Sequence, residues 1–154
     1  METGKTSFVY VTYIRSTPEK VFEAIAQPEV ARRYWGHENI SDWKPGSDWQ
    51  HVRANEQRTV NVIGKVVEVA PPTRLVITWA SPSRADDPAA YSRVTFEVEA
   101  YDDMVRLTVT HDELEAGGSM AQGISKGWPI VLSSLKSLLE TGQGIDVFAK
   151  PKAA

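Results

Sequence analysis

The sequence predicts an α+β domain in which one antiparallel sheet wraps around one long amphipathic helix near the C-terminus. Two observations carry this prediction. Between residues 91 and 111, apolar and polar side chains alternate with a period of two, which is typical of an antiparallel sheet covered on one face. Between residues 124 and 139, apolar side chains instead fall on one stripe of a helix. The order of elements is a strand, two short helices, about five further strands and the long helix, so the sheet has about six strands.

The first strand and the two short helices lie near the N-terminus. Residues 7–15, SFVYVTYIR, are rich in β-branched and aromatic residues and predict a strand. A helix follows, because Thr17 is a suitable N-cap and Pro18 fits the first helical turn. Pro28 ends that helix and begins a second short one that reaches Trp35. A loop then leads to the next strand.

The remaining strands follow one another without an intervening helix. They are predicted over residues 47–53, 58–70, 74–80, 91–100 and 104–111. Gly64 lies inside the second of these and indicates a bulge or a bend. Alternation places Phe96 and His111 on the covered face of the sheet and Thr95 on the face toward water. It also places Arg53 on the same face as His51.

The long helix is predicted to cover about residues 119–141. Ser119 and Gln122 match the spacing of a capping box, and Gly142 is a natural stop. Pro129 lies inside the apolar stripe, and a proline there removes one backbone hydrogen bond and crowds the preceding turn. Because the stripe continues in phase beyond it, the sequence predicts a kink in this helix and not its end.

The length and composition of the sequence indicate one domain of ordinary composition. A chain of 154 residues suits a single domain, here residues 6–142, with a loosely ordered tail over 143–154. The absence of cysteine excludes disulfides and thiolate chemistry. A net charge of -3 argues against nucleic acid as a partner. No apolar run approaches the roughly 20 residues of a membrane span, and no leader is evident, so a cytoplasmic location is expected.

Four stretches, in this order, resemble a known family. They are TPEKVFEAIAQPEVARRYW, GKVVEVAPPTRLVITW, VTFEVEAYDDMVRLTVTH and GWPIVLSSLKSLLE. Together they resemble the START-like or SRPBCC superfamily, and within it the activator of Hsp90 ATPase homologue 1-like family, named after the C-terminal domain of its eukaryotic member. The resemblance covers about residues 8–141, nearly the whole chain.

The resemblance implies a helix-grip (START-like) fold, a curved sheet around the last helix with a cavity between them. It further implies that many members bind small apolar ligands in that cavity, that some relatives are enzymes, and that an Hsp90-type chaperone is a partner of some. The eukaryotic namesake makes much of its chaperone contact through an additional N-terminal domain, which 154 residues leave no room for.

Residue patterns for catalysis or metal binding are mostly absent from the sequence. There is no G-x-S-x-G elbow, phosphate-binding loop or H-E-x-x-H motif, and no cofactor is indicated. His37 and His51 are fourteen residues apart, which matches no common metal spacing, so no metal site is predicted. His111 has two interpretations, a hydrogen-bonded core histidine or a residue lining a pocket.

The tryptophans carry the functional prediction. Several aromatic and histidine side chains converge on the expected gap between sheet and helix, which suits either a plain core or a cavity for an apolar ligand with a polar group. The predicted ligand-binding residues are Trp35, Trp49, His51, Trp79, Phe96, His111, Trp128 and Leu132.

Three functions therefore remain open. The first is binding of an apolar small molecule, aromatic or lipid-like. The second is a protein-interaction module of the Hsp90-activator type, a class that includes stress-response proteins. The third is an enzyme in which His51 or His111 is the general acid or base and Arg53 binds an anionic group of the substrate.

Overall fold

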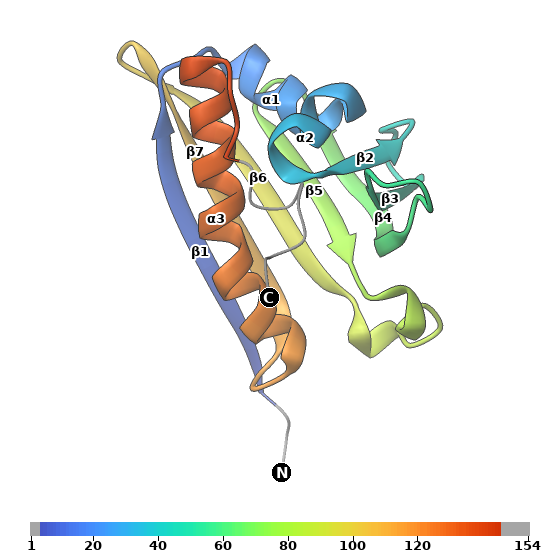
Figure 1. Cartoon of the computed structure of the whole chain (residues 1–154). Coiled ribbons are helices and arrows are strands. Elements are labelled where there is room, and N and C mark those ends of the chain that lie inside the picture. The colour runs from blue at the N-terminus through green and yellow to red at the C-terminus, as the bar shows by residue number, and fades with distance from the viewer. Residues whose placement is uncertain (1–3, 146–154) are drawn as a thin grey trace, which may run out of the picture.

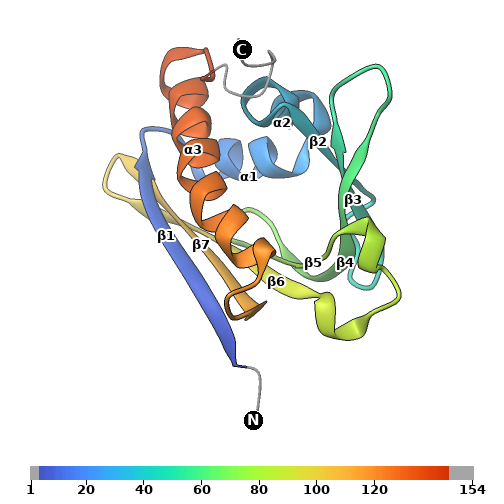
Figure 2. The ribbon, with the colours of Figure 1, turned by 60° about the horizontal axis from the view of Figure 1, so that its bottom comes forward.

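The computed structural model describes residues 4–145 of the chain. One antiparallel sheet curves around the long helix α3, and the short helices α1 and α2 cover one end of the same face (Figures 1 and 2). The sheet has seven strands in the order β1-β7-β6-β5-β4-β3-β2. The elements are β1 Lys5–Ile14, α1 Pro18–Ala26, α2 Pro28–Trp35, β2 His37–Ser41, β3 Asp48–Arg53, β4 Val60–Ala70, β5 Arg74–Trp79, the 3₁₀ turns Pro82–Arg84 and Pro88–Ala90, β6 Ser92–Tyr101, β7 Met104–Glu115 and α3 Ser119–Thr141.

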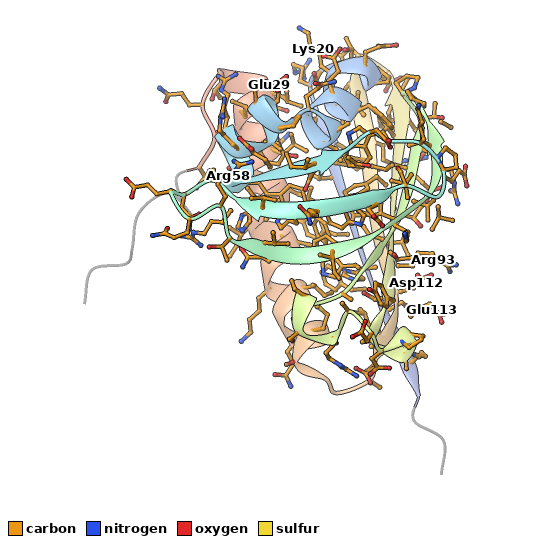
Figure 3. The ribbon with its side chains drawn as sticks, turned by 90° about the vertical axis from the view of Figure 1, so that its right-hand side faces the viewer. Lys20, Glu29, Arg58, Arg93, Asp112 and Glu113 are labelled. Atoms are coloured by element: carbon orange, nitrogen blue, oxygen red, sulfur yellow. The ribbon has the colours of Figure 1, made fainter. Side chains whose placement is uncertain are left out.

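The predicted helix-grip α+β fold is confirmed, but the sheet has one strand more than expected. The additional strand is β2, which the sequence analysis assigned to a loop. Its sequence, HENIS, is short and polar and shows no alternation, so it does not resemble a strand. Pairing with β3 and packing against α2 make it one: Glu38 is buried and accepts hydrogen bonds from Arg32 (2.9 Å) and Arg58 (2.6 Å). Figure 3 shows Arg58 on the side of the molecule where β2 and α2 lie.

The caps predicted for the helix ends are confirmed in part. Thr17 caps α1, since its hydroxyl accepts a hydrogen bond from the backbone N–H of Lys20 at 3.2 Å. The predicted capping box of α3 is wrong, because the N-cap is Gly118 and no side chain caps the helix there. Helix α3 continues through Pro129 and ends at Gly142, which has a φ of 89° and donates to the carbonyl of Leu138 at 2.8 Å.

The described start of the predicted tail is attached to the domain. The hydroxyl of Ser134, buried on α3, accepts a hydrogen bond from the N–H of Ile145 at 2.9 Å and donates to its carbonyl at 3.1 Å. Gly144 lies close to Arg33, because a Cβ atom at this glycine would be 2.7 Å from the Arg33 carbonyl oxygen. The rest of the segment expected to be loosely ordered lies outside the described residues.

The outer face of the sheet is less exposed than its alternation predicts. Thr95, assigned to the face toward water, is buried, as is its neighbour Val76 on β5. Charged side chains shield this strip. Arg74 bonds to Glu97 at 3.1 Å, and Arg93 and Asp112 pair nearby (Figure 3). Long side chains can cover apolar surface with their stems while their charged ends remain in water, which explains the difference.

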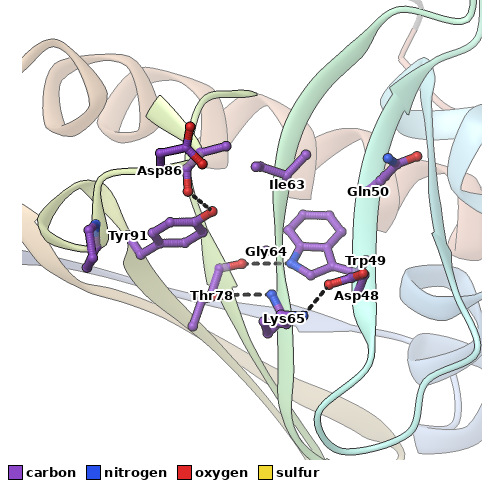
Figure 4. Close-up of a pocket in the computed structure, with 11 residues that line it drawn as sticks. Asp48, Trp49, Gln50, Ile63, Gly64, Lys65, Thr78, Asp86 and Tyr91 are labelled. Carbon is purple, nitrogen blue, oxygen red and sulfur yellow. Dashed lines mark hydrogen bonds and ion pairs between the residues drawn. The ribbon is translucent and has the colours of Figure 1, made fainter. Parts of the chain in front are cut away.

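Gly64 occupies a point where no side chain fits. The indole N–H of Trp49 passes over Gly64 and donates to the carbonyl of Thr78 at 2.7 Å (Figure 4). A Cβ atom on Gly64 would overlap that carbonyl oxygen and lie 2.5 Å from Nε1 of Trp49. The sequence indicated a bulge or bend here. The structural reason for the glycine is this close approach of a neighbouring strand.

Gly64→Ala is expected to lower the free energy of unfolding by about 2–4 kcal/mol, because overpacking adds to the loss of the Trp49 hydrogen bond. Urea unfolding of the two proteins measures the difference. Gly123→Ala is the matched control, since a Cβ there meets nothing within 4 Å and alanine favours the helix. An equal stability for wild type and Gly64→Ala would show that β5 moves freely away from this position.

Candidate functional site

A cavity of about 160 Å³ lies where α3 crosses the sheet. The end of α2, the strands β3 and β5, and one side of α3 contribute its walls. The lining residues are Trp35, His51, Trp79, Gly123, Ile124, Gly127, Trp128 and Val131. Of the residues predicted to bind a ligand, Trp35, His51, Trp79 and Trp128 thus line one cavity. Their rings are in mutual contact, with centroids 5.5 Å apart for Trp35 and Trp128 and 5.6 Å for Trp79 and Trp128.

The other predicted residues lie behind this wall and do not line the cavity. Trp49 packs against Trp79 with ring centroids 5.5 Å apart, and Phe96 meets Trp128 edge to face at 5.8 Å. His111 and Leu132 are buried in the core. Trp49, Phe96 and His111 contact the lining tryptophans and so help to fix the positions of their rings.

Apart from Trp128, the part of the wall that α3 contributes was not predicted from the sequence. Ile124 and Val131 belonged to the apolar stripe of the helix but were not selected as site residues. Gly123 and Gly127 are one helical turn apart, and a Cβ atom on either would meet nothing within 4 Å. Glycine inside a helix costs about 1 kcal/mol relative to alanine. Two glycines on one side of an amphipathic helix were the available indication of an open space.

His111 is fixed in one tautomer by its partners. The indole N–H of Trp128 can only donate, and it lies 3.1 Å from Nδ1 of His111, so Nδ1 carries no proton. The proton is therefore on Nε2, which donates to the hydroxyl of Ser92 at 2.7 Å, and Ser92 in turn donates to the carbonyl of Trp79 at 3.1 Å. Burial lowers the pKa of His111 to about 4. This histidine is a neutral link between sheet and helix.

His51 is held in the opposite tautomer. The side-chain amide of Asn39 donates to the carbonyl of Ile25 at 2.8 Å, which leaves its oxygen to accept from Nδ1 of His51 at 2.7 Å. His37 stacks on His51 with ring centroids 4.3 Å apart. Burial, and then the charge of His37, lower the pKa of His51 well below its usual value. Nε2 of a neutral His51 is then a hydrogen-bond acceptor.

A second, larger hollow of about 590 Å³ lies between β3, β4, β5 and the segment that joins β5 to β6 (Figure 4). Trp49 is the one predicted site residue that lines it. Some of its polar groups bond to one another: Lys65 pairs with Asp48 at 2.6 Å, and the Tyr91 hydroxyl donates to the carbonyl of Ala85 at 2.9 Å. This hollow is the space beneath a folded connection.

Two kinds of feature are absent from residues 4–145. These residues contain no group of three or more histidine, cysteine, aspartate or glutamate residues placed to hold a metal ion. Within the same range, no helix has the length and apolar character needed to cross a membrane.

Solved structures with this fold come from several organisms. The chain is similar to the solution structure of the Aha1 dimer from Colwellia psychrerythraea, with a TM-score of 0.74 and 20% identity over 90% of this chain and 99% of that one. It is similar to protein MLL2253 from Mesorhizobium loti, with a TM-score of 0.73 and 24% identity over 88% and 97% of the two chains. An HSP90 activator from Plasmodium falciparum gives a TM-score of 0.71 and 21% identity over 86% and 95%.

At these identities the structures show a shared fold. No curated protein sequence matches the chain. The family described as "Activator of Hsp90 ATPase homolog 1-like protein" matches residues 15–140, a range that contains α1, α2, β2 to β7 and nearly all of α3. The chain therefore belongs to the activator of Hsp90 ATPase homolog 1-like protein family.

Proposed function

We propose that this protein binds a small apolar molecule in the cavity between α3 and the sheet. The observation that carries the proposal is a cavity of about 160 Å³ walled by the rings of Trp35, Trp79 and Trp128. A cavity of about 150 Å³ engineered into another protein holds benzene. Indole rings bury large apolar areas and add stacking energy of about 0.5–1.5 kcal/mol beyond the buried area.

The volume narrows the class of ligand. A single aromatic ring with a small substituent fits a volume of about 160 Å³, whereas a long lipid chain would extend beyond it. The aromatic alternative among the expected ligands is therefore favoured over the lipid-like one.

Binding accounts for the site better than catalysis does. A general base works best when its pKa lies near the working pH. His111 has a pKa of about 4, uses both ring nitrogens in hydrogen bonds and does not line the cavity. His51 does line it, but its pKa is well below the usual value. Arg53, expected to bind an anionic substrate group, is exposed at the end of β3.

A surface contact with an Hsp90-type chaperone is the second candidate function. It is supported by the family's description and by the similarity to the Plasmodium falciparum HSP90 activator. Edge strand β1 provides a surface for it, because Val9 is 55% exposed and Val11 44% exposed on the same side. Stimulation of a chaperone's ATPase that is lost in a Val9→Ser, Val11→Ser variant, which leaves the cavity intact, would favour this function.

The cavity proposal is tested with toluene as the probe, by calorimetric titration of wild type and two variants of α3. Gly127→Leu fills the open space beside the cavity and is expected to weaken toluene binding at least about tenfold. Lys126→Leu introduces the same side chain one position away, where it does not line the cavity, and is expected to leave binding unchanged. No binding to wild type, or equal binding by the two variants, would contradict the proposal.

A further inference from the structure

The chain that follows α3 turns back along this helix. The hydroxyl of Ser137 donates to the carbonyl of Gln143 at 2.7 Å. Two residues later, the N–H and the carbonyl of Ile145 bond to the hydroxyl of Ser134 at 2.9 and 3.1 Å. The contacted position on α3 has thus moved by about one turn toward the N-terminus of the helix. The described part of the chain therefore ends while it runs antiparallel to α3.

The side of α3 that the returning chain follows leads to the cavity. Val131 and Gly127 precede Ser134 by three and seven residues, which is the spacing of neighbours on one face of a helix. Both residues line the cavity. A Cβ atom on Gly127 would meet no atom of residues 4–145 within 4 Å, so this side of the helix has space for another group. The rise of α3 from Ser134 to Gly127 is about 10 Å.

Helix α2 borders the same path. A Cβ atom on Gly144 would lie 2.7 Å from the carbonyl oxygen of Arg33 and 3.1 Å from Cα of Tyr34. The guanidinium of Arg33 also donates to the carbonyl of Gly142 at 3.2 Å. The next residue of α2, Trp35, forms part of the cavity wall. The returning chain therefore lies against two helices, and both helices contribute residues to the cavity.

Phe148 is the residue of the tail that matches this distance. It follows Ile145 by three residues and is the one aromatic residue of segment 143–154. Three extended residues span about 10 Å, which equals the rise from Ser134 to Gly127. Side chains alternate along an extended chain, so residues 145 and 148 point to opposite sides. Because Ile145 is 43% exposed, an extended continuation directs the side chain of Phe148 toward the helices and the cavity.

Resting on the proposed function above, we infer that Phe148 places its ring in the cavity and competes there with the small-molecule ligand. Its side chain is the benzyl group of toluene, and a cavity of about 160 Å³ has room for one such ring. Asp146 and Lys150 are unsuitable occupants, because no lysine, arginine, aspartate or glutamate lines the cavity to balance a buried charge. The cavity accepts a ligand only while it is free, so the apparent affinity falls with the fraction of time that the ring occupies it.

Proton NMR of the whole chain tests the contact itself. Nuclear Overhauser effects are expected between the ring protons of Phe148 and the indole protons of Trp35 and Trp128, the lining tryptophans on α2 and α3. This measurement needs no added ligand, so its result does not depend on the proposed function. Absence of these effects in wild type would overturn the inference.

Calorimetric titration with toluene tests the competition. Phe148→Ala removes the ring and is expected to bind toluene at least about threefold more tightly than wild type, the effect of a ring that fills the cavity for about two-thirds of the time. Val147→Ala shortens the neighbouring apolar side chain, which lies on the other side of an extended segment, and is expected to leave the affinity unchanged. The same gain in both variants would overturn the inference.

The results separate this inference from the proposed function. Toluene binding that Phe148→Ala does not tighten would contradict competition by the tail and leave apolar ligand binding intact. Failure of both wild type and Phe148→Ala to bind toluene would contradict the proposed function. In that case the Overhauser effects would still support or overturn the occupation of the cavity by Phe148.

Discussion

Trp128→Ala is expected to lower the free energy of unfolding by about 3–5 kcal/mol, the range of a large aromatic side chain removed from a core. Trp128 is 3% exposed and contacts the rings of Trp35, Trp79 and Phe96. Its removal also leaves Nδ1 of His111 without its donor. The contacts with Trp79 and Phe96 and this hydrogen bond join α3 to the sheet, so the substitution weakens the contact between the two layers.

The matched control is Ile130→Ala, on the same helix but with a side chain that is 45% exposed. Its expected cost is below about 0.5 kcal/mol. Trp128→Phe separates packing from hydrogen bonding, because it retains a ring but not the N–H. Urea unfolding of the three variants gives the free energies. Similar losses for Trp128→Ala and Ile130→Ala would mean that the stripe of α3 does not face the sheet as described.

Acidification from pH 7 to pH 5 is expected to destabilise the fold by about 2 kcal/mol through His111 alone. Burial lowers its pKa from 6.5 in the unfolded chain to about 4 in the folded one. The folded state therefore favours the neutral ring, and the unfolded state binds the extra proton first. The stability contributed is fully present above pH 6.5 and is lost as the pH falls from there toward 4, at up to about 1.4 kcal/mol per pH unit.

The hydrogen bond with Trp128 gives a second reason, besides burial, for the lowered pKa of His111. Protonated His111 would carry a hydrogen on Nδ1, which faces the N–H of Trp128 at 3.1 Å, so two donors would oppose each other. The lowered pKa of His51 means that its protonation also destabilises the folded state on acidification. Chemical denaturation of wild type and His111→Gln at several pH values between 5 and 7 measures the effect of His111. The variant should show a shallower dependence on pH, and identical slopes would refute the lowered pKa.

Local patterns in the sequence were enough for most of the fold. The alternation around Phe96 and the stripe that contains Trp128 are direct consequences of strand and helix periodicity, and both side chains are buried where those patterns place them. The same parity argument correctly placed His111 on the covered face. Three tryptophans and one histidine of the predicted site line the cavity because each lies on an inward-facing position of its own element or at an element's end.

What the sequence left undecided depends on neighbouring elements and side chains, which the pattern of the segment itself does not reveal. Strand β2 has no strand-like pattern of its own and forms because β3 and α2 are beside it. The capping box at Ser119 is wrong because the N-cap is Gly118 and Ser119 is already the first residue of the helix. Thr95 is buried because the charged side chains of neighbouring strands cover it.

The cavity is also a product of the tertiary structure. Trp49, Phe96, His111 and Leu132 have the same inward periodicity as the lining residues, and only the crossing point of α3 separates those that line the cavity from those that support it. Single atoms of Asn39 and Trp128 fix the tautomers of His51 and His111. Within residues 4–145, no group accepts a hydrogen bond from the N–H of Trp79. Periodicity determines which face a side chain occupies. The identity of the atom at hydrogen-bonding distance is decided by how the helix and the sheet meet in space.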